Sequence, residues 1–145
     1  EILREPADDY VRSFFRGVDV SQVLTAADIA RQDQLTIVDK GHLGLRAALQ
    51  QMHDYDRPFA YVHDRTGQFL GMVSIASVLR RLKAGERDLE AALFPMEPLA
   101  ADTDFQEVME RVADHEYPLP VVNEAGQYLG AVSQAALIRT LEREE

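Results

Sequence analysis

Two segments of this chain repeat one another, and that duplication limits the folds open to its 145 residues. Residues 58–74 read PFAYVHDRTGQFLGMVS, and residues 118–133 read PLPVVNEAGQYLGAVS. The copies are 60 residues apart before the central turn and 59 residues apart after it. The second copy therefore lacks one residue within the turn, where a deletion disturbs a fold least.

Each copy predicts a β-hairpin, because two runs rich in strand-forming residues flank a turn that contains glycine. Gly67 and Gly126 lie where such turns need a positive φ angle. Gly71 and Gly130 lie inside the returning strands, where a missing side chain permits a bulge or the close approach of another backbone. The predicted strands are 59–62 and 69–73 in the first copy and 119–122 and 128–132 in the second.

Helices are predicted on both sides of each hairpin. Ser74 and Ser133 are good N-caps for helices at 75–83 and 134–143. Before each hairpin, apolar residues follow the i, i+3, i+4, i+7 spacing of one helix face. These residues are Leu45, Ala48, Leu49 and Met52 in the first copy and Phe105, Val108, Met109 and Val112 in the second. Short strand-like pieces at 35–38 and 99–100 complete a half-repeat of strand, helix, strand, strand and helix.

The predicted fold is therefore a mixed α/β structure of two repeats, residues 19–85 and 86–145, packed as a pseudo-twofold pair. One unit of about 60 residues is marginal alone, whereas two units can cover each other's exposed sheet faces. Residues 1–18 lie outside the repeat, and they predict a short connecting helix that begins at Pro6 and ends at Gly17.

The composition excludes several classes of partner and site. With 25 acidic against 15 basic side chains the formal charge is −10, which argues against nucleic acid and against general adhesion to anionic lipid. The absence of cysteine excludes disulfides, iron–sulfur clusters and thiolate zinc sites. No apolar run approaches the ~18 residues of a membrane helix. Because the chain begins at Glu1 without a methionine, we expect it to be part of a longer protein.

The half-repeat, with its apolar strand, glycine turn and LGxVS hairpin, resembles a CBS domain, and two in tandem resemble a Bateman module. This resemblance covers about residues 21–143. The words DYVR at 9–12, FFRGVD at 14–19 and ADIA at 27–30 resemble the segment that follows the ATPase core in the ATP-binding subunit of glycine betaine/proline ABC transporters. The resemblance implies the C-terminal regulatory region of such a subunit, with residues 1–18 connecting it to the ATPase core.

The same resemblance implies partners and a location. The partners are the upstream ATPase domain of the same chain, the membrane subunit of the transporter and a second copy in a homodimer, with no nucleic acid. The location is the cytoplasm, at the cytoplasmic face of the cell membrane. The chain contains no GxxxxGK[ST] phosphate loop, so this part is predicted not to be an enzyme, whereas the full subunit that it resembles is a transport ATPase.

The resemblance also points to candidate nucleotide clefts, for an adenine nucleotide or a cyclic dinucleotide. CBS repeats that bind adenine nucleotides often carry Ser/Thr-x-x-Asp after the second hairpin strand, and the Asp holds the ribose hydroxyls. The first copy reads Ser74-Ile-Ala-Ser77 and the second Ser133-Gln-Ala-Ala136, so both lack the Asp. The candidate cleft residues are Ser74, Ser77 and Ser133, together with the strand-start residues Ile37, Ala60, Leu99 and Pro120.

Each candidate has a purely structural alternative, which the sequence favours. Ser74 and Ser133 serve as helix caps without any ligand, and the strand-start residues serve as core. The basic run at 80–83 complements the dipole at a helix C-terminus, and contact with lipid headgroups is the less favoured alternative. The acidic residues between 102 and 116 form a solvated helix face, because a cation site needs oxygens that converge from several directions.

The histidines do not predict a metal or catalytic site. His42, His53, His63 and His115 show no ligand spacing. Asp114 and Glu116 flank His115, but adjacent residues on a helix do not face one another. Ordinary surface side chains are therefore favoured over a metal or acid–base site.

Three functions remain open from the sequence. The first is a regulatory module that senses a nucleotide, and the second is a module whose charge of −10 senses ionic strength. The third is a purely structural dimerisation module that holds two ATPase subunits together without a ligand. Sensing is favoured over dimerisation alone, and the sequence does not choose between its two forms.

Overall fold

The computed structural model describes residues 24–41 and 43–144. The predicted connecting helix at 1–18 and His42 lie outside the described residues. The chain forms two compact units. Unit 2 comprises Asp33–Glu97 and Val122–Tyr128, and the described part of unit 1 comprises 24–32, Pro98–Val121 and 129–144. These units group residues by their contacts in space, whereas the predicted repeats divide the chain by sequence. The repeat boundaries at 19–85 and 86–145 therefore stay a prediction.

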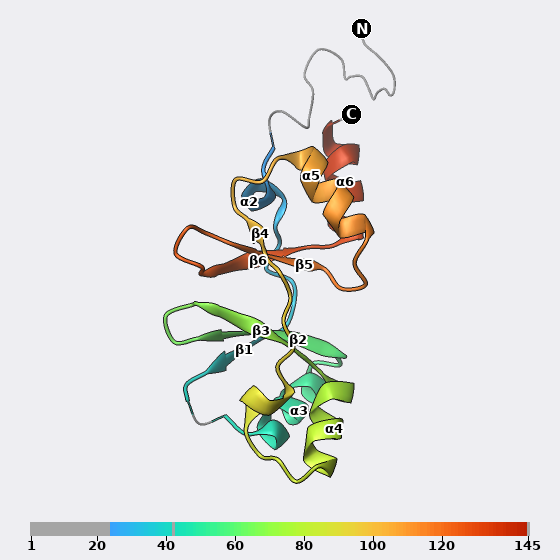
Figure 1. Ribbon diagram of the computed structural model, residues 1–145. Helices are drawn as coiled ribbons and strands as arrows, with labels where there is room; N and C mark the ends of the chain where they lie inside the picture. The colour runs from blue at the N-terminus through green and yellow to red at the C-terminus, as the bar shows by residue number, and fades with distance from the viewer. Residues whose placement is uncertain (1–23, 42, 145) are drawn as a thin grey trace, which may run out of the picture. The chain divides into compact units, whose positions relative to one another are not determined.

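Unit 2 holds a three-stranded sheet in the order β1-β2-β3, with helices on one face of it (Figure 1). β1 pairs parallel with β2, and β2 pairs antiparallel with β3. The parallel pair requires a crossover connection, which α3 supplies. The elements are β1 (Thr36–Asp39), α3 (Leu45–Asp54), β2 (Phe59–Asp64), β3 (Phe69–Ser74), α4 (Ile75–Lys83) and the 3₁₀-helix η1 (Leu89–Ala92).

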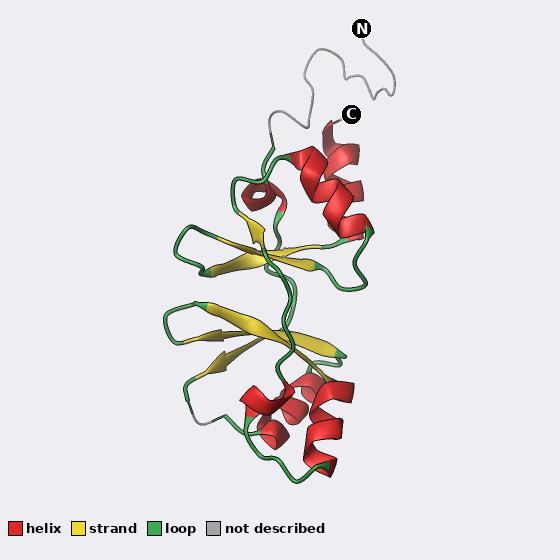
Figure 2. Cartoon of the chain, viewed as in Figure 1, coloured by secondary structure: helices red, strands yellow, loops and turns green. Residues whose placement is uncertain are grey.

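Unit 1 contains the second three-stranded sheet, in the order β4-β5-β6, and its helices also lie on one face (Figure 2). The short helix α2 contacts both α6 and β4, and α5 contacts α6. The tip of the β5–β6 hairpin, Val122–Tyr128, belongs to unit 2. The elements are α2 (Ala26–Ile29), β4 (Leu99–Ala100), α5 (Phe105–Ala113), β5 (Leu119–Val122), β6 (Tyr128–Val132) and α6 (Gln134–Glu144).

Both hairpin turns are organised by one side chain at the same position of the repeat. The Oδ1 atom of Asp64 accepts hydrogen bonds from the backbone N–H groups of Thr66 and Gln68, both at 2.9 Å. It also accepts one from the Thr66 hydroxyl at 2.7 Å, the main reason that the pKa of Asp64 lies below its usual value. Asn123 does the same in the second hairpin, where its Oδ1 accepts from the N–H groups of Ala125 and Gln127 at 3.0 and 2.9 Å. Each turn thus satisfies its own backbone donors.

A glycine in each returning strand permits a further backbone to join the sheet. Gly71 and Gly130 have φ angles of +148° and +154°, which residues with a side chain rarely adopt. A Cβ on Gly130 would lie 2.8 Å from the Arg31 carbonyl oxygen, and one on Gly71 would lie 3.0 Å from that of Phe94. The residues that follow these glycines pair with the same segments, Ala131 with Arg31 and Met72 with Phe94. The sequence left a bulge and a close backbone approach open at these glycines. The close approach is observed at both, and the β2–β3 pairing also shifts its register beside Gly71.

The core of each unit comes from the apolar positions that the helical spacing predicts. On α3 the fully buried residues are Leu45, Ala48 and Met52. On α5, Val108 is fully buried, and Phe105 and Val112 are each 1% exposed. In unit 2 the three residues of α3 pack in one cluster with strand residues such as Ile37, Val62 and Val73.

The observed elements agree closely with the predicted ones, and two short elements were not predicted. The helix predicted at 75–83 is α4, and the strands predicted at 119–122 and 128–132 are β5 and β6. The helices α2 and η1 have four residues each, which is too short for an apolar period to show.

Gly130→Ala should lower the free energy of unfolding by about 2 kcal/mol or more, because the new Cβ meets backbone in a conformation that alanine disfavours. Urea unfolding followed by circular dichroism measures the loss. Gly85→Ala is the matched control, since Gly85 has a φ of +88° but nothing within 4 Å of its added Cβ. It should cost only the conformational part, about 1 kcal/mol. Equal losses for the two variants would contradict the steric explanation.

Candidate functional site

A hollow of about 380 Å³ in unit 1 lies where the end of α5 and the start of α6 meet the open end of the β5–β6 hairpin. The hairpin brings the start of its first strand beside the end of its second, as the pairing of Phe59 with Ser74 shows in unit 2. Residues far apart in sequence therefore meet at this hollow. Its lining residues are Val112, His115, Glu116, Tyr117, Pro118, Ser133, Gln134 and Ala135.

The polar groups of this hollow are held in place by the backbone around them. The Ser133 hydroxyl oxygen accepts a hydrogen bond from the N–H of Ala136 at 3.0 Å, and it thereby caps α6. The Nδ1 atom of His115 lies 2.7 Å from the carbonyl oxygen of Arg111, so Nδ1 donates the hydrogen. Glu116 adds a carboxylate to the lining, which disfavours a phosphate and favours a neutral or cationic group.

Of the predicted cleft residues, only Ser133 lines this hollow. Ser74 and Ser77 are engaged with each other in unit 2. The Ser74 hydroxyl accepts from the N–H of Ser77 at 3.0 Å, and the Ser77 hydroxyl accepts from the N–H of Ser74 at 2.9 Å. This reciprocal capping satisfies two donors at the start of α4. The capping reading of Ser74 and Ser133 thus has observed hydrogen bonds behind it, whereas their contact with a ligand stays a prediction.

The strand-start residues are interior in both units. Ile37 is 1% exposed, and Ala60 and Leu99 are fully buried. Pro120 is buried as well. Their part in an adenine slot stays a prediction, because it requires a ligand to reach positions that side chains now cover.

Sequence reasoning missed His115, Glu116, Tyr117 and Pro118 as lining residues, because it placed His115 and Glu116 on a surface without a site. A signal was present in the hairpin itself. Residues just before the first strand of a hairpin must lie beside those just after its second strand. The sequence 115–118 was therefore predictable as the neighbour of Ser133.

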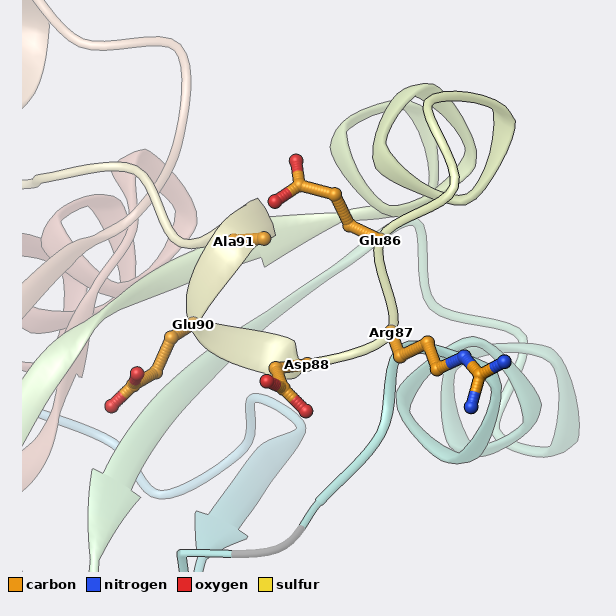
Figure 3. A pocket seen from close by; sticks show the side chains of 5 residues that line it. All are labelled: Glu86, Arg87, Asp88, Glu90 and Ala91. Atoms are coloured by element: carbon orange, nitrogen blue, oxygen red, sulfur yellow. The ribbon is translucent and has the colours of Figure 1, made fainter.

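A second hollow, of about 590 Å³, lies beside η1 in unit 2. It is lined by Glu86, Arg87, Asp88, Glu90 and Ala91. Figure 3 shows the three carboxylates pointing in different directions, and the Arg87 side chain pointing away from them. Oxygens that do not converge make a poor cation site. Within residues 24–41 and 43–144, no group of three or more His, Cys, Asp or Glu side chains is arranged to hold a metal ion.

The basic run at the end of α4 has a structural role in the described chain. Arg81 forms an ion pair with Glu86 at 3.3 Å, and both side chains are nearly half exposed. Gly85 ends the helix with a φ of +88°. Arg80 and Lys83 are exposed in the last turn of α4, where positive charge is favourable. Among the described helices, none is long and apolar enough to cross a membrane.

Tyr128 is the titratable side chain that its surroundings perturb most clearly. It lies in unit 2, where its ring stacks on Tyr61, His63 and Phe69 at centroid distances of 5.6, 6.3 and 6.2 Å. Its hydroxyl is buried, with no hydrogen-bond partner among the described residues. Burial, and secondly the charge of Asp33, raise the pKa of Tyr128 well above its ordinary value of 10.0.

Known proteins resemble this chain in sequence and in fold. The family model for the CBS domain matches residues 95–143. The glycine betaine/proline betaine transport system ATP-binding protein ProV of Salmonella typhimurium is 43% identical over 147 residues, which cover 99% of this chain and 36% of ProV. The chain thus spans about a third of the length of that relative.

The fold comparison covers both halves of the chain. A CBS domain pair/ACT domain protein from Thermotoga maritima has a TM-score of 0.65 and 23% identity, over 83% of this chain and 98% of that one. The chain has the fold of a CBS domain pair. Staphylococcus aureus OpuCA resembles this chain in fold with a TM-score of 0.68 and 16% identity, over 81% of this chain and 98% of that one. The predicted α/β fold of two repeats is confirmed.

Tyr128→Phe should stabilise the protein by about 1 kcal/mol, because it removes a buried hydroxyl that lacks a partner among the described residues. The gain should grow above about pH 10, where the unfolded wild-type chain ionises this tyrosine and the folded chain keeps it protonated. Urea unfolding of both proteins at pH 7, 9 and 11 measures the difference. Tyr128→Leu is the control for the ring and should be destabilising, since it removes the three stacked contacts. A loss of stability in Tyr128→Phe would contradict the account of an unpartnered hydroxyl.

Proposed function

We propose that this CBS pair is the regulatory module of the ATP-binding subunit of a glycine betaine/proline osmoprotectant ABC transporter. The observation that carries the proposal is the similarity to ProV, which runs over 99% of the chain at 43% identity. A match of this length covers both repeats and the preceding segment, so it is stronger than a shared domain type. In this proposal the partners are an ATPase domain in the same subunit and a membrane subunit, and the location is the cytoplasmic face of the cell membrane.

The proposed role is to sense ionic strength or an adenine-type nucleotide and to gate ATP-driven uptake. Gating requires two states of the module with different affinities for the effector. The hollow beside Ser133 is the candidate for a nucleotide, because it contains one of the predicted cleft residues and joins a hydroxyl, an imidazole and a tyrosine at one place. Its carboxylate, Glu116, opposes a phosphate there, which makes the proposed nucleotide site testable by changing one charge.

Glu116→Gln should tighten the binding of AMP or ADP about fivefold, since removing one nearby negative charge favours a phosphate by roughly 1 kcal/mol. Isothermal titration calorimetry of the chain with AMP, ADP, ATP and cyclic di-AMP measures the affinities. Glu110→Gln is the matched control, because it makes the same charge change on α5 outside the hollow. If neither the wild type nor Glu116→Gln binds any of the four ligands, the nucleotide form of the proposal fails. If both variants change affinity equally, binding lies elsewhere.

The ionic-strength form of the proposal depends on the excess of acidic side chains. The screening length falls from ~10 Å at 0.1 M salt to ~3 Å at 1 M salt, so repulsion between a module of charge −10 and an anionic membrane weakens as salt rises. The exposed acids of α5 are Glu107 and Glu110. Asp104 is left unchanged in the test, because its Oδ1 atom caps α5 by accepting from the N–H of Glu107 at 2.9 Å.

Replacing Glu107 and Glu110 by Gln should move the salt midpoint of transporter ATPase activity to lower salt, because less screening is then needed. The measurement uses the full ATP-binding subunit in the assembled, membrane-reconstituted transporter. Replacing Glu90 and Glu124 by Gln is the control, since it removes the same charge from exposed positions outside α5. An unmoved midpoint in the α5 variant would contradict the electrostatic form.

A purely structural role remains the alternative function. In that case the module pairs with a second copy and holds two ATPase subunits together without a ligand. The exposed apolar side chains on α4 and α6, Leu79 and Ile138, favour such self-association. A monomer in analytical ultracentrifugation at high concentration would exclude it.

A further inference from the structure

A third hollow, of about 420 Å³, is formed in unit 2 by the start of α3, the end of α4 and the segment that follows α4. Two arginines line it, Arg46 from the first turn of α3 and Arg87 from the segment after α4. Both residues are exposed, in a chain whose formal charge is −10. A hollow that gathers two positive charges on so acidic a chain raises the local concentration of anions.

Backbone hydrogen bonds hold together the two segments that carry these arginines. The N–H of Leu45 donates to the carbonyl oxygen of Arg87 at 2.8 Å. The N–H of Leu89 donates to the carbonyl oxygen of Leu43 at 3.1 Å. The fold therefore fixes the backbone positions of Arg46 and Arg87 at one hollow, although the two residues are 41 positions apart in the sequence.

The negative groups beside this hollow already have partners. Glu86 brings a carboxylate to the lining, and Arg81 pairs with that carboxylate at 3.3 Å. The last carbonyl groups of α4 would also repel an anion. They accept hydrogen bonds of 3.0–3.2 Å from the backbone N–H groups of residues 84–86. Repulsion of an anion by this side of the hollow is thereby reduced.

The two guanidinium groups, by contrast, have no ion-pair partner among residues 24–41 and 43–144. Figure 3 shows the Arg87 side chain extending away from the carboxylates of Asp88 and Glu90, which line the hollow beside η1. Arg80 and Lys83 add exposed positive charge in the last turn of α4. The arginines of this hollow are therefore available to an anion that enters it.

We propose that this hollow is a binding site for a phosphate group, which Arg46 and Arg87 hold by forked hydrogen bonds. A guanidinium presents its N–H donors in a planar fork that matches the oxygens of a phosphate. Two like charges at one hollow repel each other, and a bound anion offsets that repulsion. The site lies in unit 2, whereas the hollow proposed for a nucleotide lies in unit 1, so the two proposals stand or fall separately.

Pyrophosphate is the soluble probe, and isothermal titration calorimetry of the chain at low salt measures its affinity. Arg46→Gln and Arg87→Gln, made separately, should each weaken binding about tenfold, because each removes charged hydrogen-bond donors. Arg57→Gln is the matched control, since it removes the same charge from an exposed position of unit 2 outside the hollow. It should leave the affinity within about twofold of the wild type, because distant exposed charges are screened.

A further variant separates the forked contact from simple attraction of charge. Arg87→Lys keeps the positive charge and loses the planar fork, so it should bind pyrophosphate nearly as weakly as Arg87→Gln. Wild-type affinity in Arg87→Lys would overturn the forked site and leave only a general attraction of anions to this end of unit 2.

A phosphate group comes either from a soluble compound or from a phospholipid headgroup, and a second arm of the experiment distinguishes these sources. The chain is sedimented with vesicles of phosphatidylcholine and phosphatidylglycerol in equal parts. Vesicle binding that Arg87→Gln abolishes and Arg57→Gln retains assigns the site to a headgroup, whereas binding of pyrophosphate alone assigns it to a soluble phosphate. The proposal is overturned if neither probe binds, or if Arg57→Gln weakens binding as much as Arg46→Gln and Arg87→Gln do.

Discussion

The approach of a second backbone to the glycine of each returning strand is the constraint on which both units depend. At Gly71 the backbone is that of Phe94, and at Gly130 it is that of Arg31. In both places two hydrogen bonds join the next residue to the approaching segment, from Met72 to Phe94 and from Ala131 to Arg31. A side chain at either glycine would push the segments apart. The further segment can pair with each three-stranded sheet only because the repeat carries glycine there.

This constraint explains why the two hairpin segments are more alike in sequence than the rest of the repeat. The turn, the strand glycine and the serine cap serve the backbone, and the backbone is the same in both copies. Elsewhere the copies have diverged. Ser77 takes part in reciprocal capping in α4, whereas the matching Ala136 only donates its N–H to Ser133. The second copy has its hollow at this simpler cap, and that is where the candidate site lies.

The divergence of charge between the copies bears on function more directly than the total charge does. The sum of −10 gave reason to exclude nucleic acid and to propose a response to salt. The structure distributes that charge unevenly, with a basic end on α4 and exposed acids on α5. The charge that a test of the salt response should change is therefore that of the exposed acids on α5, Glu107 and Glu110.

The sequence by itself determined the secondary structure and the paired architecture. The apolar patterns of helices and strands, the turn glycines and the serine caps are all local signals of a few residues. The elements α4, β5 and β6 were therefore predictable to the residue. The close approach at Gly71 and Gly130 was one of the two alternatives that the sequence left open, and the sequence did not name the approaching segment. Tertiary structure alone decided that residues 24–32 join unit 1, and that the loop before β5 lines a hollow with Ser133. It also decided that Tyr128 stacks on the aromatic residues of unit 2 with a buried, unpartnered hydroxyl. These features depend on contacts between residues far apart in the chain, and no local pattern of side chains encodes which distant segment will meet them.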